Sequence, residues 1–249
     1  MRCEFHYLPV VPASHNHSLI DRAPVASHTR TTTTPAEAAM IVAICFGWAI
    51  YSSVWAVLAG FPTGGQGASA TFSDASLISI VVVELIVGGA ALLLLHARRY
   101  AVATLVPTPT LKESLLGVGL YLAASVAGGV LASPFTVRVD DEPIAQMMSQ
   151  ASLSLPVLLL MAMVNGTFEE VFVLGFLQRG LMERGPSVAV GVALLVRLLY
   201  HLYQGPMGAV WVTGFGLVFG LFYLRTGRLW PAVFAHMLGD LVPFVGSFS

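Results

Sequence analysis

The sequence predicts an all-α protein, a polytopic bundle of transmembrane helices. Hydrophobic residues make up 56% of its 249 residues and charged residues only 10%, whereas soluble domains carry about 25% charged residues. The apolar residues also gather in blocks that approach the length of about 20 helical residues needed to cross a bilayer core. Helices are expected because backbone polar groups in lipid must be satisfied within each segment, and the strict alternation of a barrel strand is absent.

Seven apolar segments follow one another, and an eighth would arise if the long fourth segment were divided. Short joints rich in Pro and Gly separate them, as turns require. We see no internal repeat and no second domain, so the chain divides into a disordered polar tail, 1–36, and a transmembrane helical domain, 37–249. The predicted spans, in order, are 38–60, 76–96, 114–133, 154–182, 186–203, 207–225 and 229–247.

The tail is rich in Ser, Thr, Pro and His and contains no apolar stretch long enough for the core of a signal peptide. Its histidines are irregularly spaced, so we interpret them as incidental and not as a metal site. These histidines are His6, His15, His17 and His28. The two cysteines of the chain are too few for a disulfide framework and are interpreted as unpaired thiols.

The basic residues predict how the helices are oriented. If the tail is cytosolic, seven spans place 10 of the 12 Lys and Arg residues on the inner side or at inner helix ends, with Arg138 and Arg197 as exceptions. The positive-inside rule therefore favours a cytosolic N-terminus and an external C-terminus. We expect an integral membrane protein in the plasma membrane of a prokaryote. The partner is a lipid bilayer, and a net charge of −1 argues against nucleic acid.

Away from the helix ends, seven acidic, basic or histidine residues lie within the apolar segments, where charges are costly and are usually paired or functional. Six of them follow residue 165, which concentrates the polar chemistry in the last third of the chain. Glu84 stands apart, and we expect it to form a structural hydrogen bond to a neighbouring helix. The seven are Glu84, Glu169, Glu170, Arg197, His201, His236 and Asp240.

Helical spacing predicts how these side chains lie. Glu169 and Glu170 are adjacent, so their directions differ by about 100° and we expect one to face a reaction centre and the other a supporting partner. His236 and Asp240 are four residues apart, on one helix face. A carboxylate and an imidazole in a pocket of low dielectric constant suit the activation of water. The alternative, polar contacts that only join helices, stays open.

Three motifs carry a resemblance to a known family. They are GTFEEVFVLGFLQRGL with the two glutamates, LLVRLLYHLYQG about 30 residues later, and GLVFGLFYLRTGRLWPAVFAHMLGDLV with the final histidine. In this order they resemble the CPBP (Abi) family of CAAX-protease and bacteriocin-processing intramembrane proteases, which includes the type II CAAX prenyl endopeptidases. The resemblance covers about residues 150–247.

The resemblance implies hydrolysis of a peptide bond in a membrane-associated or lipidated substrate. Glu169 would activate water with His201, His236 and Asp240 would complete the site, and Glu170 would support it. Asp240 stands at a position that is often Asn, where the side chain helps to hold the oxyanion. Two histidines and carboxylates could ligate zinc, but His-Glu-x-x-His spacing is absent, so we expect no metal and no other cofactor.

The sequence departs from the family pattern at two positions. The first motif is usually EExxxR, but Leu174 replaces the arginine; the second is usually FxxxH, but Arg197 replaces the phenylalanine. Our hypothesis is that Arg197 supplies the missing cation and pairs chiefly with Glu170. Arg179 is a rival partner, although its place near the helix end favours an interfacial position.

Two other classes of function stay open. Loss of the motif arginine is also expected in a non-proteolytic member with an immunity or scaffold role. A proton-coupled transporter would also use intramembrane carboxylates and histidines, but it would more often show related halves or broken helices.

Overall fold

The computed structural model describes residues 29–60, 72–134 and 142–244, and within them the chain is helical, with two isolated β-bridges as its only extended pairing. Six helices are long and apolar enough to cross a membrane. This confirms the polytopic helical bundle. The six are α1 (Pro35–Leu58), α2 (Asp74–Ala97), α3 (Leu111–Ala132), α5 with its continuation η3 (Leu155–Gln178), α6 with η5 (Pro186–Gln204) and α7 (Pro206–Thr226).

The seventh predicted span is shorter than expected. Helix α8 (Trp230–Leu241) has 12 residues and is about 18 Å long at 1.5 Å per residue. It ends where Pro243 lacks an amide donor and disfavours helix in the residue before it, and the short turn η6 (Val242–Phe244) follows. In the described part of the chain, six helices and not seven therefore meet the length of a span.

The helices begin either at side chains that accept from free backbone amides or directly after glycines that allow a sharp turn of the chain. The Thr34 hydroxyl accepts from the Glu37 amide at the start of α1, and Ser73 with Ser76 forms a capping box at the start of α2. Gly185 and Gly205, with φ of 102° and 91°, precede α6 and α7 and make the sharp reversals that β-carbons would strain.

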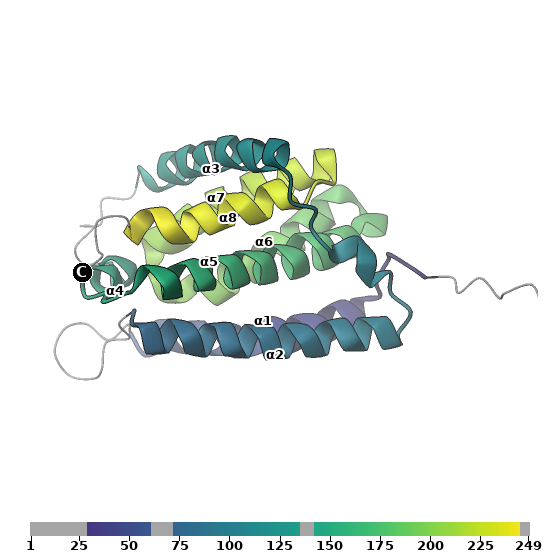
Figure 1. Ribbon diagram of the computed structural model, residues 1–249, viewed down its shortest axis with the longest axis horizontal. Coiled ribbons are helices and arrows are strands. Elements are labelled where there is room, and N and C mark those ends of the chain that lie inside the picture. Colours follow the sequence, from purple (N-terminus) through teal and green to yellow (C-terminus); the bar gives the residue numbers. More distant parts are fainter. Residues whose placement is uncertain (1–28, 61–71, 135–141, 245–249) are drawn as a thin grey trace, which may run out of the picture.

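The helices form a bundle with the C-terminal helices in its middle. Figure 1 shows α1 and α2 along one side, α3 along the opposite side, and α5 to α8 between them. Helix α3 approaches its neighbours closely at glycines: a β-carbon on Gly128 would lie 2.9 Å from Trp211, and one on Gly214 would lie 2.8 Å from Leu131. Small residues at such contacts are typical of membrane helix packing.

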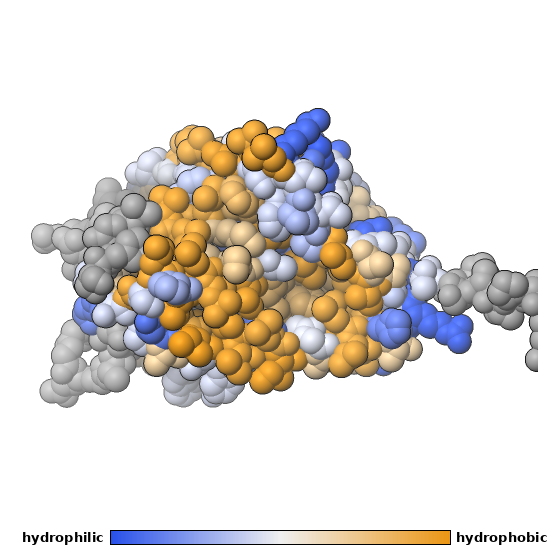
Figure 2. Space-filling model, in the orientation of Figure 1, coloured by the Kyte–Doolittle hydropathy of each residue, from blue (hydrophilic) through white to orange (hydrophobic). Residues whose placement is uncertain are grey.

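The outside of the bundle is apolar in the way that a lipid-facing surface requires. Trp48, Leu93 and Leu111 are each more than 70% exposed. Figure 2 shows hydrophobic residues over the middle of the visible face and hydrophilic ones toward the ends. An apolar belt of this kind places the protein in a bilayer.

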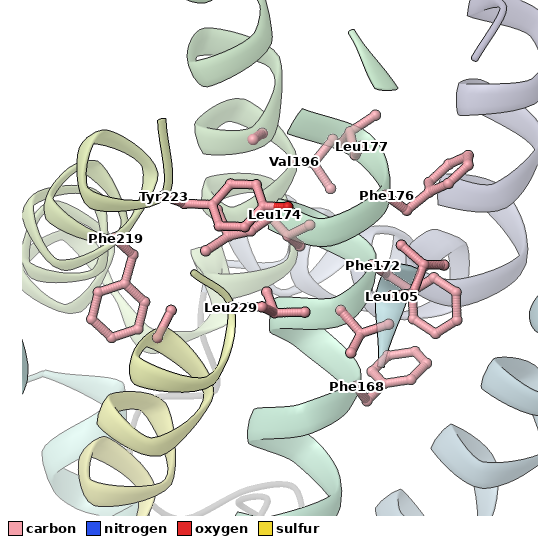
Figure 3. Close-up of a cluster of buried hydrophobic side chains, with 14 of the residues drawn as sticks. Leu105, Phe168, Phe172, Leu174, Phe176, Leu177, Val196, Phe219, Tyr223 and Leu229 are labelled. Atoms are coloured by element: carbon pink, nitrogen blue, oxygen red, sulfur yellow. The ribbon is translucent and has the colours of Figure 1, made fainter. Parts of the chain in front are cut away.

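The main apolar core surrounds η3 (Val171–Gln178), a π-helical continuation of α5. Phe172, Leu174 and Phe176 of η3 are buried there together with Phe219 of α7. Figure 3 shows these side chains with Leu105 and Leu229 around the same segment. Leu174, which stands at the motif arginine's position, therefore lies in an apolar environment.

The remaining short elements lie at the two ends of the bundle. Helix α4 (Pro143–Ser149) lies at the end where α2 begins, whereas η1 (Val102–Leu105) and η4 (Met182–Arg184) lie at the other end. There, residues 29–34 pack across the helix ends: the Thr33 amide donates to the Gly180 carbonyl, and the Tyr100 hydroxyl donates to the Thr31 carbonyl. The rest of the predicted tail, 1–28, lies outside the described residues.

Candidate active site

The two adjacent glutamates lie where α5 changes into the π-helical segment η3. Glu169 and Glu170 are the last residues of α5, and eight π-helical residues follow. π-helical turns are rare and occur frequently at functional sites. Both carboxylates are buried, Glu170 completely. Charge is therefore held in the bundle interior, where it requires partners.

Arg197 of α6 is the cation that faces these carboxylates. Its Nη2 donates to both oxygens of Glu170, at 2.7 and 2.8 Å, and its Nη1 lies 3.5 Å from Glu169 Oε2. Only 2% of Arg197 is exposed, so the pair is shielded from water. The contact is the one predicted from the two motif departures. Arg179, the rival, instead donates to the Thr104 carbonyl near the helix end.

Tyr200 of α6 is a contact that sequence reasoning missed. Its hydroxyl donates to Glu169 Oε2 at 2.5 Å, and its ring stacks on Phe46 with centroids 4.9 Å apart. The tyrosine directly precedes His201, and one turn of helix separates it from Arg197. A buried hydroxyl requires a partner, so a tyrosine beside the motif histidine was the available signal.

The two glutamates, one expected to face a reaction centre and the other a supporting partner, belong to one cluster. Oxygens of Glu169 and Glu170 and a ring nitrogen of His236 lie within 4.8 Å of one another. The backbone directions do diverge, but Arg197 and His236 each carry two nitrogens that point to different carboxylates. One guanidinium and one imidazole therefore link both glutamates into a single cluster.

His236 of α8 lies between three carboxyl groups. Its Nδ1 lies 2.5 Å from Glu170 Oε1, while its Nε2 lies 3.8 Å from Glu169 Oε2 and 3.7 Å from Asp240 Oδ1. The Nδ1 contact requires a proton on that nitrogen because the carboxylate of Glu170 accepts. The predicted pairing of His236 and Asp240 on one face of α8 is present.

Asp240 has a second partner that the sequence reading did not include. Asn165 Nδ2 donates to Asp240 Oδ2 at 3.0 Å. Asn165 lies one turn before Glu169 on α5, so it is on the same side of that helix. Its polar amide in an otherwise apolar stretch of α5 was the available signal.

His201 ends α6 at the edge of the cluster. Its Nδ1 lies 2.9 Å from the Arg197 carbonyl oxygen, which only accepts hydrogen bonds, so Nδ1 carries the proton. In the neutral ring, Nε2 then keeps a free lone pair. No direct bond joins His201 to Glu169 among the described residues, and the ring instead packs beside Tyr200, with centroids 4.4 Å apart.

A cavity of about 300 Å³ reaches the cluster. Four of the predicted site residues line it, namely Arg197, His201, His236 and Asp240. Aromatic and sulfur-containing side chains form most of the remaining wall, among them Phe72, Met148, Met161, Trp211, Phe215 and Phe244. His201 and His236, which lie on different helices, thus share one cavity.

Glu84 lies outside this cluster. It lines an apolar groove of about 460 Å³ between α2, η1 and the α5–η3 helix, and its Oε2 is buried with no hydrogen-bond partner. The structural hydrogen bond expected for Glu84 is therefore not formed by this oxygen.

Comparison with known proteins gives one family match. Residues 151–242 match the family model described as type II CAAX prenyl endopeptidase Rce1-like. The match contains all three motifs and every predicted site residue, and it confirms the resemblance to the CPBP family over this part of the chain. No curated protein and no solved structure matches.

Proposed function

We propose that the protein is an intramembrane endopeptidase that hydrolyses a peptide bond in a membrane-associated or lipidated substrate. The observation that supports this most is the cluster in which Glu169, Glu170, Arg197 and His236 meet beside a cavity that His201 also lines. The match of residues 151–242 to the Rce1-like family model also supports a CAAX-type protease at the level of the family.

Glu169 is the proposed general base. Its contacts with Tyr200, Arg197 and His236 all fall on Oε2, which leaves Oε1 to accept a proton from water. The free Nε2 of His201 orients that water from the cavity wall. The water oxygen then bonds to the peptide carbonyl carbon while its proton passes to Glu169.

The tetrahedral intermediate collapses when the C–N bond breaks and Glu169 returns the proton to the leaving amine. The products are a carboxylic acid and an amine, so atoms and charges balance. Negative charge that develops on the carbonyl oxygen is stabilised by fixed positive groups in a site of low dielectric constant. Arg197 and His236 supply these groups.

Glu170 and Asp240 are supporting residues in this proposal. Glu170 holds Arg197 and His236 in place. Asp240 is an acceptor beside His236 Nε2 and is bonded by Asn165. Because a carboxylate cannot donate to an oxyanion as an amide does, we assign Asp240 to the orientation of His236.

We also propose that no metal is required. Glu169, Glu170 and His236 are close enough to share an ion, but both oxygens of Glu170 already accept from Arg197. A divalent cation among these ligands would lie against a buried guanidinium, and the repulsion between them would be strong at low dielectric constant. The donor set therefore does not fit zinc while Arg197 is present.

The test is cleavage of a library of lipid-tethered peptides by the full-length protein in liposomes, with fragments identified by mass spectrometry. We expect the wild type to cleave, with or without a chelator, and Glu169→Ala and His201→Ala to lose cleavage. Glu183→Ala is the matched control, because Glu183 is an exposed glutamate at the far end of the bundle. Cleavage that survives both site substitutions would contradict the proposed assignment. Loss of cleavage in the presence of the chelator would show that the reaction requires a metal.

A further inference from the structure

The two ends of the bundle differ in charge. Nine Lys and Arg residues lie in the described part of the chain, and eight of these are at the end where α1 begins and α2 finishes. The ninth, Arg197, is in the buried cluster. The eight are Arg30, Arg98, Arg99, Lys112, Arg179, Arg184, Arg225 and Arg228.

This distribution orients the helices in a membrane. Positive residues in short joints and at helix ends are retained on the cytosolic side. The acidic residues at the opposite end, Asp74 and Glu142, have no basic neighbour there among the described residues. The end that carries η1 and η4 is therefore the cytosolic end, and the end that carries α4 faces away from the cytosol.

The cavity beside the candidate active site lies at the end that faces away from the cytosol. Its walls come from the end of α6 with η5, the first half of α7, the second half of α8 with η6, and α4. Phe72, which precedes α2, completes the wall. All of these segments belong to the α4 end of the bundle, which Figure 1 shows opposite the end at which α1 begins.

Helix α4 lies at the mouth of this cavity. Ile144 and Met148 are one helical turn apart and both line the cavity. Glu142, just before α4, accepts from the Met207 amide at the start of α7 and so fixes α4 against the helix that forms the adjacent wall.

The chemistry of the walls indicates what enters. Apart from the cluster at its inner end, the cavity is lined mainly by aromatic and aliphatic side chains, and a volume of about 300 Å³ falls at the lower end of the range for small-molecule sites. Burying a charged side chain against such walls would be costly, whereas an apolar one gains free energy on burial. The complement of the cavity is an uncharged, apolar side chain on a peptide.

From these observations we propose that the cavity opens on the extracytosolic side of the membrane and takes peptide segments presented there, with an apolar side chain next to the bond to be cleaved. The part about cleavage rests on the proposed function, whereas the side on which the cavity opens does not.

The orientation is tested by cysteine labelling in intact cells that express the full chain, with both native cysteines replaced by serine. Gln204→Cys lines the cavity, Ser149→Cys lies at the end of α4, and Thr108→Cys is exposed at the opposite end. We expect a membrane-impermeant thiol reagent to label Gln204→Cys and Ser149→Cys as fully before as after permeabilisation. Thr108→Cys should react only after permeabilisation. The reverse pattern would overturn the proposal.

A second measurement decides the case in which a cysteine variant misfolds or stays unlabelled. A periplasmic reporter enzyme fused after residue 249 should be active and a cytosolic fluorescent reporter inactive, because α8 runs toward the α4 end. The opposite result would contradict the proposed side. Neither measurement needs cleavage, so a protein that cleaves nothing would refute the function and leave the orientation standing.

The substrate arm compares membrane vesicles of the two orientations. Right-side-out vesicles should cleave an externally added lipid-tethered peptide with leucine beside the scissile bond, and should cleave poorly the same peptide with lysine there. Inverted vesicles should cleave neither until they are opened. Cleavage of the external peptide by sealed inverted vesicles, or equal cleavage of both peptides, would count against the proposal.

Discussion

Arg197 and Glu170 form a buried ion pair in which one guanidinium nitrogen donates to both carboxylate oxygens, at 2.7 and 2.8 Å. The pair joins α6 to the end of α5. In the EExxxR pattern of the family, the arginine would instead come from the α5–η3 helix itself. Leu174, which replaces that arginine, is packed in the apolar core. The cation that contacts Glu170 in this structure therefore comes from α6 and not from the α5–η3 helix.

Arg197→Leu should therefore destabilise the protein strongly. Removal of one partner of a buried pair leaves an uncompensated charge and typically costs about 3–5 kcal/mol. Unfolding in detergent, followed by tryptophan fluorescence, measures the change. Leu174→Arg alone should also destabilise, because it buries a guanidinium among apolar side chains.

The double variant Arg197→Leu, Leu174→Arg tests whether the two positions exchange roles. If the arginine at 174 can reach Glu170, the double variant should be more stable and more active than Arg197→Leu alone, with a favourable coupling energy in the double-mutant cycle. Additive losses of stability and activity in the double variant would contradict the idea that one arginine replaces the other.

Tyr200→Phe should lower the turnover number with little change in KM. The hydroxyl holds Glu169 Oε2 at 2.5 Å, and a hydrogen bond to a charged group contributes about 1.5–3 kcal/mol, which corresponds to roughly a tenfold to hundredfold change in rate. The measurement is steady-state cleavage of the best substrate from the peptide library.

Tyr203→Phe is the matched control for this substitution. Tyr203 lines the same cavity and lies near His201, but among the described residues its hydroxyl is not bonded to Glu169. Equal losses in both variants would indicate general damage to the cavity and would remove the positioning role of Tyr200.

The sequence predicted the helical bundle well because apolar length and turn residues are local properties. It also predicted the Arg197–Glu170 contact, since an unmatched cation and an unmatched carboxylate in lipid have few other partners. The last span was overestimated because apolar composition continues past Pro243, where the helix has already ended.

The inner geometry of the site could not be predicted from spacing alone. Spacing gives directions around one helix, whereas the meeting of Glu169 and Glu170 at His236 depends on how α8 packs against α5 and on the π-helical turn that follows the glutamates. Tyr200 and Asn165 were missed because they are neutral, and a search for charges in apolar segments passes over them.

Glu84→Gln should leave the protein as stable as the wild type or more stable. The buried Glu84 Oε2 has no hydrogen-bond partner, so a charge on this carboxyl group is desolvated without a compensating bond at that oxygen. A neutral amide of the same shape reduces this cost. Glu37→Gln is the control: Glu37 accepts from Arg30 at 2.5 and 2.6 Å and from Thr33 at 2.8 Å. Its loss should lower the melting temperature, whereas a large drop for Glu84→Gln would show that Glu84 has a stabilising partner.

Gly128→Ala should destabilise the contact between α3 and α7, whereas Gly129→Ala should not. A β-carbon on Gly128 would lie 2.9 Å from both the ring and the carbonyl oxygen of Trp211, but one on Gly129 meets nothing within 4 Å. Because the obstacle includes backbone, the helices must separate, and overpacking of this kind costs about 1–3 kcal/mol. Both glycines lie within the same helix, so alanine's higher helix propensity favours the two variants equally. Thermal unfolding in one detergent compares them directly, and equal melting temperatures would show that α3 does not pack against Trp211 at this distance.

Trp211 also lines the cavity, so Gly128→Ala should in addition weaken cleavage through a raised KM.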